Sequence, residues 1–232
     1  MRVEMQSSEP LTRVARTKAA SLERREARKR ELRGEILRAA STEFLEQGPE
    51  NFSLRRVAER IGYSPTTIYL YFQNKEDLLL STVQDGFKSF DRTIQDAVEG
   101  TADAPTKLTA LGRAYITFGM ENPALYRLMF MQPSNDFAMP RLLGIGSSPE
   151  DLEAVPNQPL HHRVVAQELL VATVKDGIAA QQFRAGDPIL MADALWAGVH
   201  GLVSLAVSPM MAPEHAEKVI DPLLETLISG LK

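Results

Sequence analysis

Apolar residues recur along this chain every three or four positions, the spacing that places side chains on one face of an α-helix. The clearest case is expected to run from about Lys75 to Glu99, for about six turns. Its stripe consists of Leu79, Val83, Phe87, Phe90, Ile94 and Val98. An earlier stripe, formed by Leu32, Ile36, Ala40 and Phe44, predicts a first helix over about Glu26 to Gln47. Strand-like alternation is absent, so the pattern predicts an all-α protein.

Pro, Gly and Asn residues mark where the later helices begin and end. The expected helices are about Thr106 to Glu121, Ala124 to Met131, Leu160 to Gln182, Pro188 to Val207 and Pro213 to Leu231. Residues 132–159 are rich in Pro, Gly, Ser and Asn and form a long connection for a compact domain. A short helix near Met139 to Leu143 is an open alternative there.

Residues 53–75 have the spacing of a helix-turn-helix. Ala58 is small at the point where the second helix has to cross closely over the first. Gly62 follows where the first helix ends, and glycine adopts the left-handed backbone of that position without strain. Ile68 comes six residues later and is expected to hold the second helix against the first, where Val57 and Ile61 form the matching apolar face.

The ends of these two short helices also carry signals. Ser53 is expected to cap the first helix and Ser64 the second, each accepting a hydrogen bond from a free backbone N–H. Pro65 then takes the first position of the second helix, where its missing N–H costs nothing. Spacing, caps and apolar faces agree, so we interpret the segment as a helix-turn-helix.

With Ile68 directed inward, Thr66 and Leu70 fall on the opposite side of the second helix, and Tyr69 falls on its flank. Hydroxyls can pair with base edges, Leu70 can touch a thymine methyl, and cations such as Arg60 can bind phosphates. The alternative is that Tyr69, Tyr71 and Leu70 only pack within the small domain. The predicted DNA contacts are Ser53, Arg55, Arg56, Tyr63, Ser64, Thr66, Thr67, Tyr69, Leu70, Tyr71 and Lys75.

The run TTIYLYFQNKEDLL resembles the end of the DNA-binding domain in the TetR family of transcriptional regulators. There an aromatic pair closes the recognition helix, and a lysine, an acidic residue and leucines open a long fourth helix. The matching positions are Tyr71, Phe72, Lys75, Glu76, Leu78 and Leu79. The resemblance covers about residues 30–80, and it implies a two-domain helical dimer that leaves its operator when a small molecule binds the C-terminal domain.

On this basis we expect a flexible N-terminal arm (1–27), a DNA-binding domain (28–74) and a ligand-binding and dimerisation domain (75–232). Charge supports the division. Residues 1–75 hold 15 Lys or Arg and 10 Asp or Glu, a balance of +5, whereas residues 76–232 have a balance of −9. A basic module facing nucleic acid and an acidic module turned away from it fit this asymmetry.

The arm enters the first helix through a basic run. It consists of Arg24, Arg25, Arg28, Lys29, Arg30 and Arg33. One reading is an arm that follows phosphates or reaches into a minor groove. The other is a solvated tail with a charged helix start.

The C-terminal part is rich in aromatic and methionine side chains, which suit an apolar or amphipathic small molecule held between helices. Ordinary core packing is the alternative for each of them. The predicted ligand contacts are Phe87, Phe90, Tyr115, Phe118, Tyr126, Met129, Phe130, Trp196 and His200.

Small residues concentrate at 195–207, including Gly198 and Gly201, and an interior helix glycine costs about 1 kcal/mol. Trp196, His200 and Gly201 also resemble the Trp…His-Gly signature of one TetR subgroup. The family's dimer interface uses its last two long helices, so we expect a homodimer through residues 188–207 and 213–231. Packing within one chain is the alternative.

Other classes of site lack support. The four histidines are scattered, so we expect neither a metal site nor a cofactor, and no arrangement suggests catalysis. The chain has no cysteine, which fits a reducing cytoplasm, and we found no apolar run near the 20 or so residues that span a bilayer.

The predicted function is therefore a cytoplasmic, homodimeric transcriptional repressor that a small apolar or amphipathic effector releases from a palindromic operator. Three alternatives remain: an activator of the same fold, a small-molecule-binding protein with a non-functional helix-turn-helix, and an enzyme of the same shape.

Overall fold

The computed structural model describes residues 13–131, 165–208 and 210–232, and within these ranges all regular structure is helical. The part expected to bind DNA consists of α1 (Arg13–Asn51), α2 (Leu54–Arg60) and α3 (Pro65–Tyr69). α4 (Lys75–Val98) leads away from it to α5 (Ala104–Glu121) and α6 (Pro123–Phe130). α9 (Val165–Ala179), α10 (Pro188–Ala206) and α11 (Pro213–Ser229) complete the described part.

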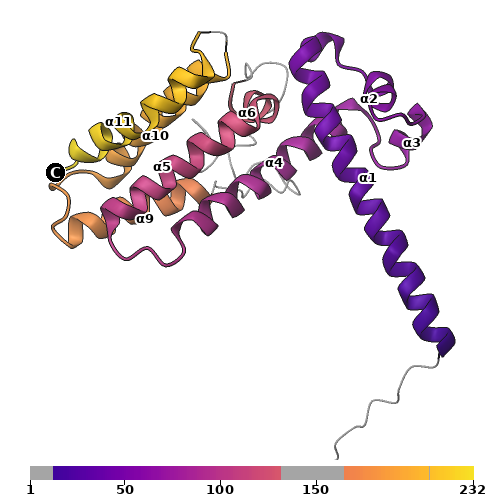
Figure 1. Cartoon of the computed structure of the whole chain (residues 1–232), viewed down its shortest axis with the longest axis horizontal. Helices are drawn as coiled ribbons and strands as arrows, with labels where there is room; N and C mark the ends of the chain where they lie inside the picture. The colour runs from indigo at the N-terminus through magenta and orange to yellow at the C-terminus, as the bar shows by residue number, and fades with distance from the viewer. Residues whose placement is uncertain (1–12, 132–164, 209) are drawn as a thin grey trace, which may run out of the picture.

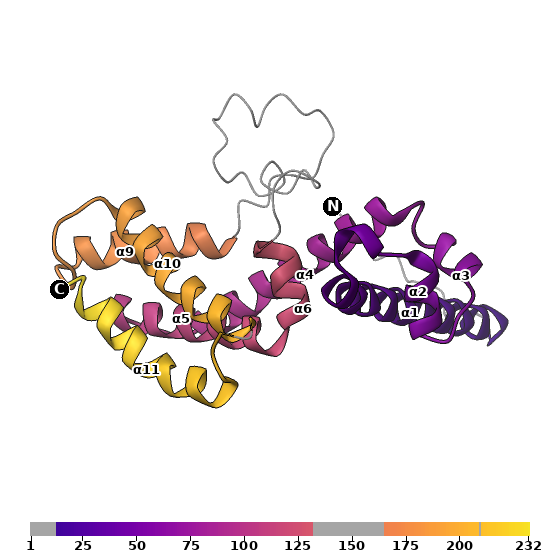
Figure 2. The same ribbon diagram turned by 90° about the horizontal axis from the view of Figure 1, so that it is seen from above.

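The molecule is elongated, with α3 at one end and the C-terminus at the other (Figure 1). Figure 2 shows α4 and α6 between the part expected to bind DNA (α1 to α3) and the remaining helices (α5 and α9 to α11). Both helices pack against α1, while α4 also packs against α5. Buried apolar residues form one continuous cluster from Ile36 in α1 to Leu231 at the C-terminus. A shift of α4 or α6 would therefore displace α1, which belongs to the part expected to bind DNA.

Helix ends follow the local sequence signals. The side chain of Asn74 accepts a hydrogen bond of 2.8 Å from the backbone N–H of Asp77 and so caps α4. Asp77 accepts in return from the N–H of Gln73, also at 2.8 Å. Asp187 caps α10 through the N–H of Ile189 at 2.8 Å. The two bonds of Asp77, to Asn74 and Gln73, fix the point at which α4 leaves the part expected to bind DNA.

The first helix is longer than predicted, because it begins at Arg13 rather than near Glu26. The expectation of an unstructured arm is thus wrong for residues 13–27. They have no apolar stripe, but Ala, Arg, Lys, Glu and Leu are strong helix formers. The predicted end is confirmed, since Gly48 leaves helical geometry with φ of 72°.

Some predictions lie outside the described residues: the connection 132–159, the short helix near Met139 to Leu143, and the start of the helix at Leu160. One composition-based expectation is wrong. By length and hydropathy alone, α10 could cross a bilayer, with 19 residues and a mean hydropathy of 1.6. A core or interface helix meets the same two criteria, and α10 packs against α5, α9 and α11.

Candidate nucleic-acid interface and effector site

The helix-turn-helix has the predicted geometry. Gly62 has φ of 73°, and the N–H of Tyr63 after it donates to the carbonyl of Ala58 at 2.9 Å. The hydroxyl of Ser64 accepts a hydrogen bond of 3.3 Å from the backbone N–H of Thr67, with Pro65 at the first helical position. Ile68 and Ala58 are both fully buried. The second helix is thus held on the first along one side only.

The opposite side of α3 is open to solvent. Leu70 is 76% exposed, Tyr69 58% and Tyr63 44%, and Thr66 is exposed as well. The predicted outward direction of Thr66 and Leu70 is confirmed. Large apolar side chains on a surface usually mark an interaction site when they stand together. The alternative that Tyr69 and Leu70 only pack the domain does not fit their exposure.

Two predicted contacts have a structural part instead. Thr67 is half-buried, and its hydroxyl lies 3.1 Å from that of Ser64, so it stabilises the cap. Tyr71 is half-buried against the core. Ser53 stands at the first cap position, but its side chain accepts no capping bond, so that prediction is wrong. Its carbonyl accepts the N–H of Val57 at 3.1 Å.

The arginines of α2 are engaged with carboxylates of the same chain. Arg55 pairs with Glu59 at 2.9 Å, and Arg56 donates to Gln47 and lies 3.8 Å from Glu43. Arg60 bridges Glu43, at 3.1 Å, and Glu46. Glu59 is a local partner, four residues after Arg55. Gln47, Glu43 and Glu46 lie 9 to 17 residues before the arginines they contact, a separation that local spacing does not reveal.

The Arg60 bridge joins α2 to α1. Hydrogen bonds to Glu46, which has the larger effect, and to Glu43 raise the pKa of Arg60 above its usual value. The Glu43 side chain is only 3% exposed, so removing its partner would leave a buried charge. Arg60 therefore positions α2. Arg55 and Arg56 remain exposed enough to reach a phosphate, in competition with their present partners. Lys75, half-buried at the start of α4, has no ion pair within the described residues.

The predicted ligand contacts come together in one aromatic cluster where α4, α5, α6 and α10 meet. Phe90 lies at its centre, with ring centroids 5.3 Å from Tyr115, 5.1 Å from Phe118 and 5.8 Å from Phe130. Phe87 contacts Phe130 at 5.4 Å. Such edge-on pairs add to the apolar burial. All nine predicted residues are buried or half-buried.

A polar network lies at the α10 side of this cluster. The indole N–H of Trp196 donates to the Tyr115 hydroxyl at 3.2 Å. The hydroxyls of Tyr115 and Tyr126 are 3.0 Å apart, and they lie 3.1 Å and 2.6 Å from Nδ1 of His200. Trp196 and His200 lie one turn apart on α10 and share a face, with ring centroids 5.3 Å apart. Four side chains from three helices thus meet at one point.

Burial keeps this network uncharged. It lowers the pKa of His200, raises that of Tyr115 to about 12, and raises that of Tyr126 further. A neutral imidazole accepts at Nδ1 when its proton is on Nε2. Hydrogen-bond consistency then assigns the Tyr126 O–H as donor to Nδ1 and the Tyr115 O–H as donor to Tyr126. The Nε2–H edge of His200 has no partner within the described residues, so it can donate to an acceptor on a ligand.

Sequence reasoning missed the close contact between α6 and α4. A methyl group added at Gly86 would lie 2.7 Å from the sulfur of Met129 and 2.9 Å from Cδ1 of Leu125. Only glycine lets α6 approach so closely. The signal was present, because a glycine inside a helix of this length is unfavourable without a packing reason.

A surface hollow of about 440 Å³ was also missed. It lies between α10 and α11 near the C-terminus, and its walls include Arg184, Leu190, Met191 and Leu227. None of the nine predicted ligand contacts lines it. Those nine remain a predicted effector site, supported by their clustering.

The predicted dimer helices α10 and α11 pack side by side. The outer side of α10 carries a stripe of exposed or half-buried apolar and small residues, which we call the α10 stripe: Leu190, Ala194, Ala197, Gly201 and Leu205. Around Gly201 a methyl group would meet nothing within 4 Å, so no neighbour in the chain explains this glycine. Gly198 differs, because Leu227 of α11 packs directly on it. The alternative of packing within one chain therefore holds for Gly198.

Across residues 13–131, 165–208 and 210–232, no three metal-binding side chains gather. His161 and His162 lie outside these ranges, and His215 is exposed.

Two models of known protein families match separate parts of the chain. A family model described as bacterial regulatory proteins of the tetR family matches residues 36–82. A second, described as the tetracyclin repressor-like C-terminal domain, matches residues 108–231, which is more than half of the chain.

Two characterised relatives match part of the chain. The HTH-type transcriptional activator FasR of Mycolicibacterium smegmatis is 30% identical over 107 residues, 46% of this chain and 48% of that protein. The fatty acid metabolism regulator protein of Bacillus subtilis is 28% identical over 103 residues, 44% of this chain and 53% of that protein. The chain spans about half the length of the curated relatives it matches.

Two solved structures resemble nearly the whole chain. PfmR, a TetR family transcriptional regulator from Thermus thermophilus, has a TM-score of 0.62 and 25% identity over 82% of this chain and 93% of its own. FadR from Bacillus subtilis, solved in complex with stearoyl-CoA, has a TM-score of 0.60 and 21% identity over 85% and 98%. At 21% identity, the resemblance to FadR shows a shared fold alone.

Proposed function

The chain belongs to the TetR family of bacterial regulatory proteins, and from this we propose that it is a ligand-responsive, DNA-binding transcriptional regulator. The observation that carries the proposal is α3: one side is locked by Ile68, and the other presents Thr66, Tyr69 and Leu70 to solvent. A threonine hydroxyl and a leucine methyl are suited to base edges in a major groove. A DNA-binding regulator has to share a compartment with the bacterial chromosome, so the proposal includes a cytoplasmic location.

A homodimer through α10 and α11 would present two copies of α3 to one duplex. Two-fold symmetry then implies a palindromic operator whose half-sites lie about one helical turn apart. The α10 stripe supports this arrangement, because it is an apolar surface with an unexplained glycine at its middle. Packing two such stripes together would bury Leu190 and Leu205.

The effector we propose is a molecule with a long acyl chain and a hydrogen-bond acceptor, of the fatty acyl-CoA class. The aromatic cluster around Phe90 is suited to an apolar chain, and the Nε2–H of His200 to an acceptor such as a thioester carbonyl. Two similar proteins from Bacillus subtilis agree with this class: one is a fatty acid metabolism regulator protein, and FadR was solved in complex with stearoyl-CoA.

Coupling to DNA would run through α4 and α6. Tyr126 and Phe130 of the cluster lie on α6, whose other side packs against α1, and Met129 meets α4 at Gly86. An effector that enters the cluster has to move these side chains, and α6 with them. It can shift the DNA-binding conformer only by its difference in affinity for the two states. A coupling of about 1–3 kcal/mol corresponds to a 5- to 150-fold change in operator affinity.

We propose repression, with operator release on effector binding. Activation is the second candidate, favoured by the name of the FasR relative. A helical binding protein with a non-functional helix-turn-helix fits less well, because the exposed face of α3 would then have no role. Nothing in the described residues suggests an enzyme.

The effector proposal is tested with the full chain and an operator that it selects from random duplexes. Stearoyl-CoA should weaken operator binding 5- to 150-fold, measured by fluorescence anisotropy, while free coenzyme A should have little effect. Tyr126→Phe removes one hydroxyl of the network and should raise the stearoyl-CoA concentration required, without changing operator affinity in its absence. Unchanged operator affinity across an acyl-CoA series would refute this effector class. Tighter binding instead would favour the activator.

A further inference from the structure

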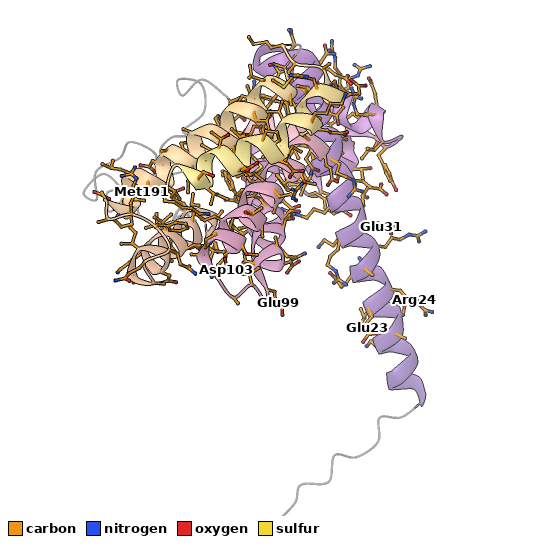
Figure 3. All side chains as sticks on the ribbon, turned by 60° about the vertical axis from the view of Figure 1, so that its left-hand side comes forward. Glu23, Arg24, Glu31, Glu99, Asp103 and Met191 are labelled. Atoms are coloured by element: carbon orange, nitrogen blue, oxygen red, sulfur yellow. The ribbon has the colours of Figure 1, made fainter. Side chains whose placement is uncertain are left out.

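The N-terminal part of α1 extends from the body of the molecule as a free helix. Lys18 and residues 20–31 are all exposed, and Leu22 is 53% exposed. Figure 3 shows Glu23, Arg24 and Glu31 on this stretch, away from the other helices. At 1.5 Å per residue, residues 13–31 extend roughly 27 Å. A helix that packs on nothing has to be explained by its propensity or by a partner.

One narrow face of this helix carries three cations and no carboxylate. At 100° per residue, Lys18, Arg25 and Lys29 fall within about 40° of one another, and we call them the basic stripe. Glu31 and Glu35 fall on the far side. The same line continues along α1 through Leu32 and Ile36 to Glu43, so the basic stripe extends the face that α1 uses for packing.

That face points to the side where α2 and α3 lie. Glu43, in line with the basic stripe, pairs with Arg60 and approaches Arg56, both in α2. The free end of α1 and α3 lie at the same end of the molecule, opposite the C-terminus (Figures 1 and 2). A duplex that contacts α3 would therefore pass the side of α1 that carries the basic stripe.

The helix-turn-helix itself has few cations to spare. α3 contains none, and the arginines of α2 are paired with Glu59, Glu43 and Glu46. Within the described part of the chain, the cations of the basic stripe have no ion pair. Phosphate contacts supply much of the affinity of DNA-binding proteins, so they have to come from somewhere on this surface.

We propose that the basic stripe of α1 binds the phosphate backbone of duplex DNA beside the operator. The proposal rests on the proposed function and extends its interface by about eight base pairs per protomer, at 3.4 Å per base pair. An anionic membrane is the less fitting partner, because Leu22 is the one large apolar residue among residues 18–31 and membrane-surface helices need a broad apolar face.

The test compares two double variants of the full chain. Arg25→Gln with Lys29→Gln removes two charges of the stripe. Arg24→Gln with Arg30→Gln removes two charges that lie about 120° away on the same helix. All four residues are exposed, and glutamine is a good helix former, so folding should be unaffected. Binding is measured against salt concentration on the selected operator, first within a 40-base-pair duplex and then trimmed to the selected core.

On the long duplex, the slope of log affinity against log salt should become shallower by about 3.6 for the stripe variant, because the bound dimer loses two phosphate contacts per protomer at about 0.9 each. The matched variant should change it by less than half as much, and sequence preference should be unaltered in both. On the trimmed duplex the difference between wild type and stripe variant should shrink. Equal slopes for the two variants, or a difference that survives trimming, would overturn the proposal.

Loss of binding to phosphatidylglycerol vesicles by the stripe variant, with its DNA slope unchanged, would overturn it in favour of a membrane. A further variant of α3 separates this proposal from the proposed function. Suppose that changing Thr66, Tyr69 and Leu70 to Ala abolishes sequence preference while the stripe variant behaves as wild type. Only the inference about α1 then fails. If the wild type selects no sequence, both fail.

Discussion

At the scale of single residues, the Tyr115, Tyr126, Trp196 and His200 network is the most specific chemistry in the C-terminal part. Four polar groups on apolar walls are costly to bury unless each finds a partner. Here each hydroxyl and Nδ1 has one, at 2.6 to 3.2 Å. The Nε2–H of His200 is the group available to a ligand, which makes His200 a specificity residue of the proposed site.

Burial of this histidine predicts a pH effect. Because burial lowers the pKa of His200, the unfolded chain binds a proton below about pH 6.5 that the folded chain excludes. The free energy of unfolding should therefore fall as pH drops from 6.5 towards the folded pKa. The slope is at most about 1.4 kcal/mol per pH unit, and less because the ring is half-exposed.

His200→Gln should remove that part of the acid destabilisation, measured by urea unfolding at pH 7.5 and 5.5. Carboxylates contribute to both proteins and cancel in the difference. His215→Gln, at an exposed position of α11, is the control and should retain the wild-type pH dependence. If His200→Gln lost as much stability in acid as the wild type, the neutral-network account would be wrong.

At the scale of helices, close approach explains how α5 holds both the network and α10. A methyl group at Gly119 would collide with Cγ1 of Val203 in α10 and lie 3.0 Å from the ring of Tyr126 in α6. Val203 and Tyr126 are fully buried, and a valine side chain has little rotamer freedom. Three helices therefore converge at a point where only glycine fits.

Gly119→Ala should consequently destabilise the protein by about 1–3 kcal/mol, as overpacked cores do, in spite of alanine's better helix propensity. The measurement is the shift of the urea midpoint. Gly34→Ala in α1 is the matched control: its added methyl would meet only Arg38, at an ordinary 3.5 Å, so it should stabilise by up to about 1 kcal/mol. A stabilised Gly119→Ala would show that α5 and α10 are not packed this closely.

The sequence predicted what local chemistry determines. Periodicity located the helices, while Gly62, Ser64, Pro65 and Ile68 predicted the geometry of the helix-turn-helix in detail. It could not predict the partners of Arg60, because Glu43 and Glu46 lie 17 and 14 residues away and reach it only through the packing of α2 on α1. Nor could it predict the free part of α1, whose helix depends on propensity without an apolar stripe.

At the scale of the whole molecule, the proposed function depends on a second copy of the chain. One protomer presents a reading surface of three exposed side chains, Thr66, Tyr69 and Leu70, which is too small to select a site by itself. The α10 stripe is where two protomers would join. Its exposed residues Leu190 and Leu205 flank Gly201, around which the protomer leaves open space.

Gly201→Glu tests that interface. A Cβ added at Gly201 meets no atom of the protomer within 4 Å, so the fold should be retained, but a buried carboxylate on each side of a two-fold contact would separate the dimer. Sedimentation should show a monomer, with operator affinity reduced at least tenfold. Ala172→Glu, at an exposed position of α9, adds the same charge away from the stripe and should stay dimeric. An unchanged Gly201→Glu dimer would exclude this interface.

The central claim is that the exposed side of α3 reads DNA, and the most direct test is selection from a pool of random duplexes. The wild-type chain should enrich a palindrome with half-sites about 10 base pairs apart. Changing Thr66, Tyr69 and Leu70 to Ala, which leaves the Ser64 cap and Ile68 in place, should abolish the enrichment while circular dichroism and unfolding stay as in the wild type. Enrichment of the same palindrome by this variant, or of no sequence by the wild type, would contradict the account.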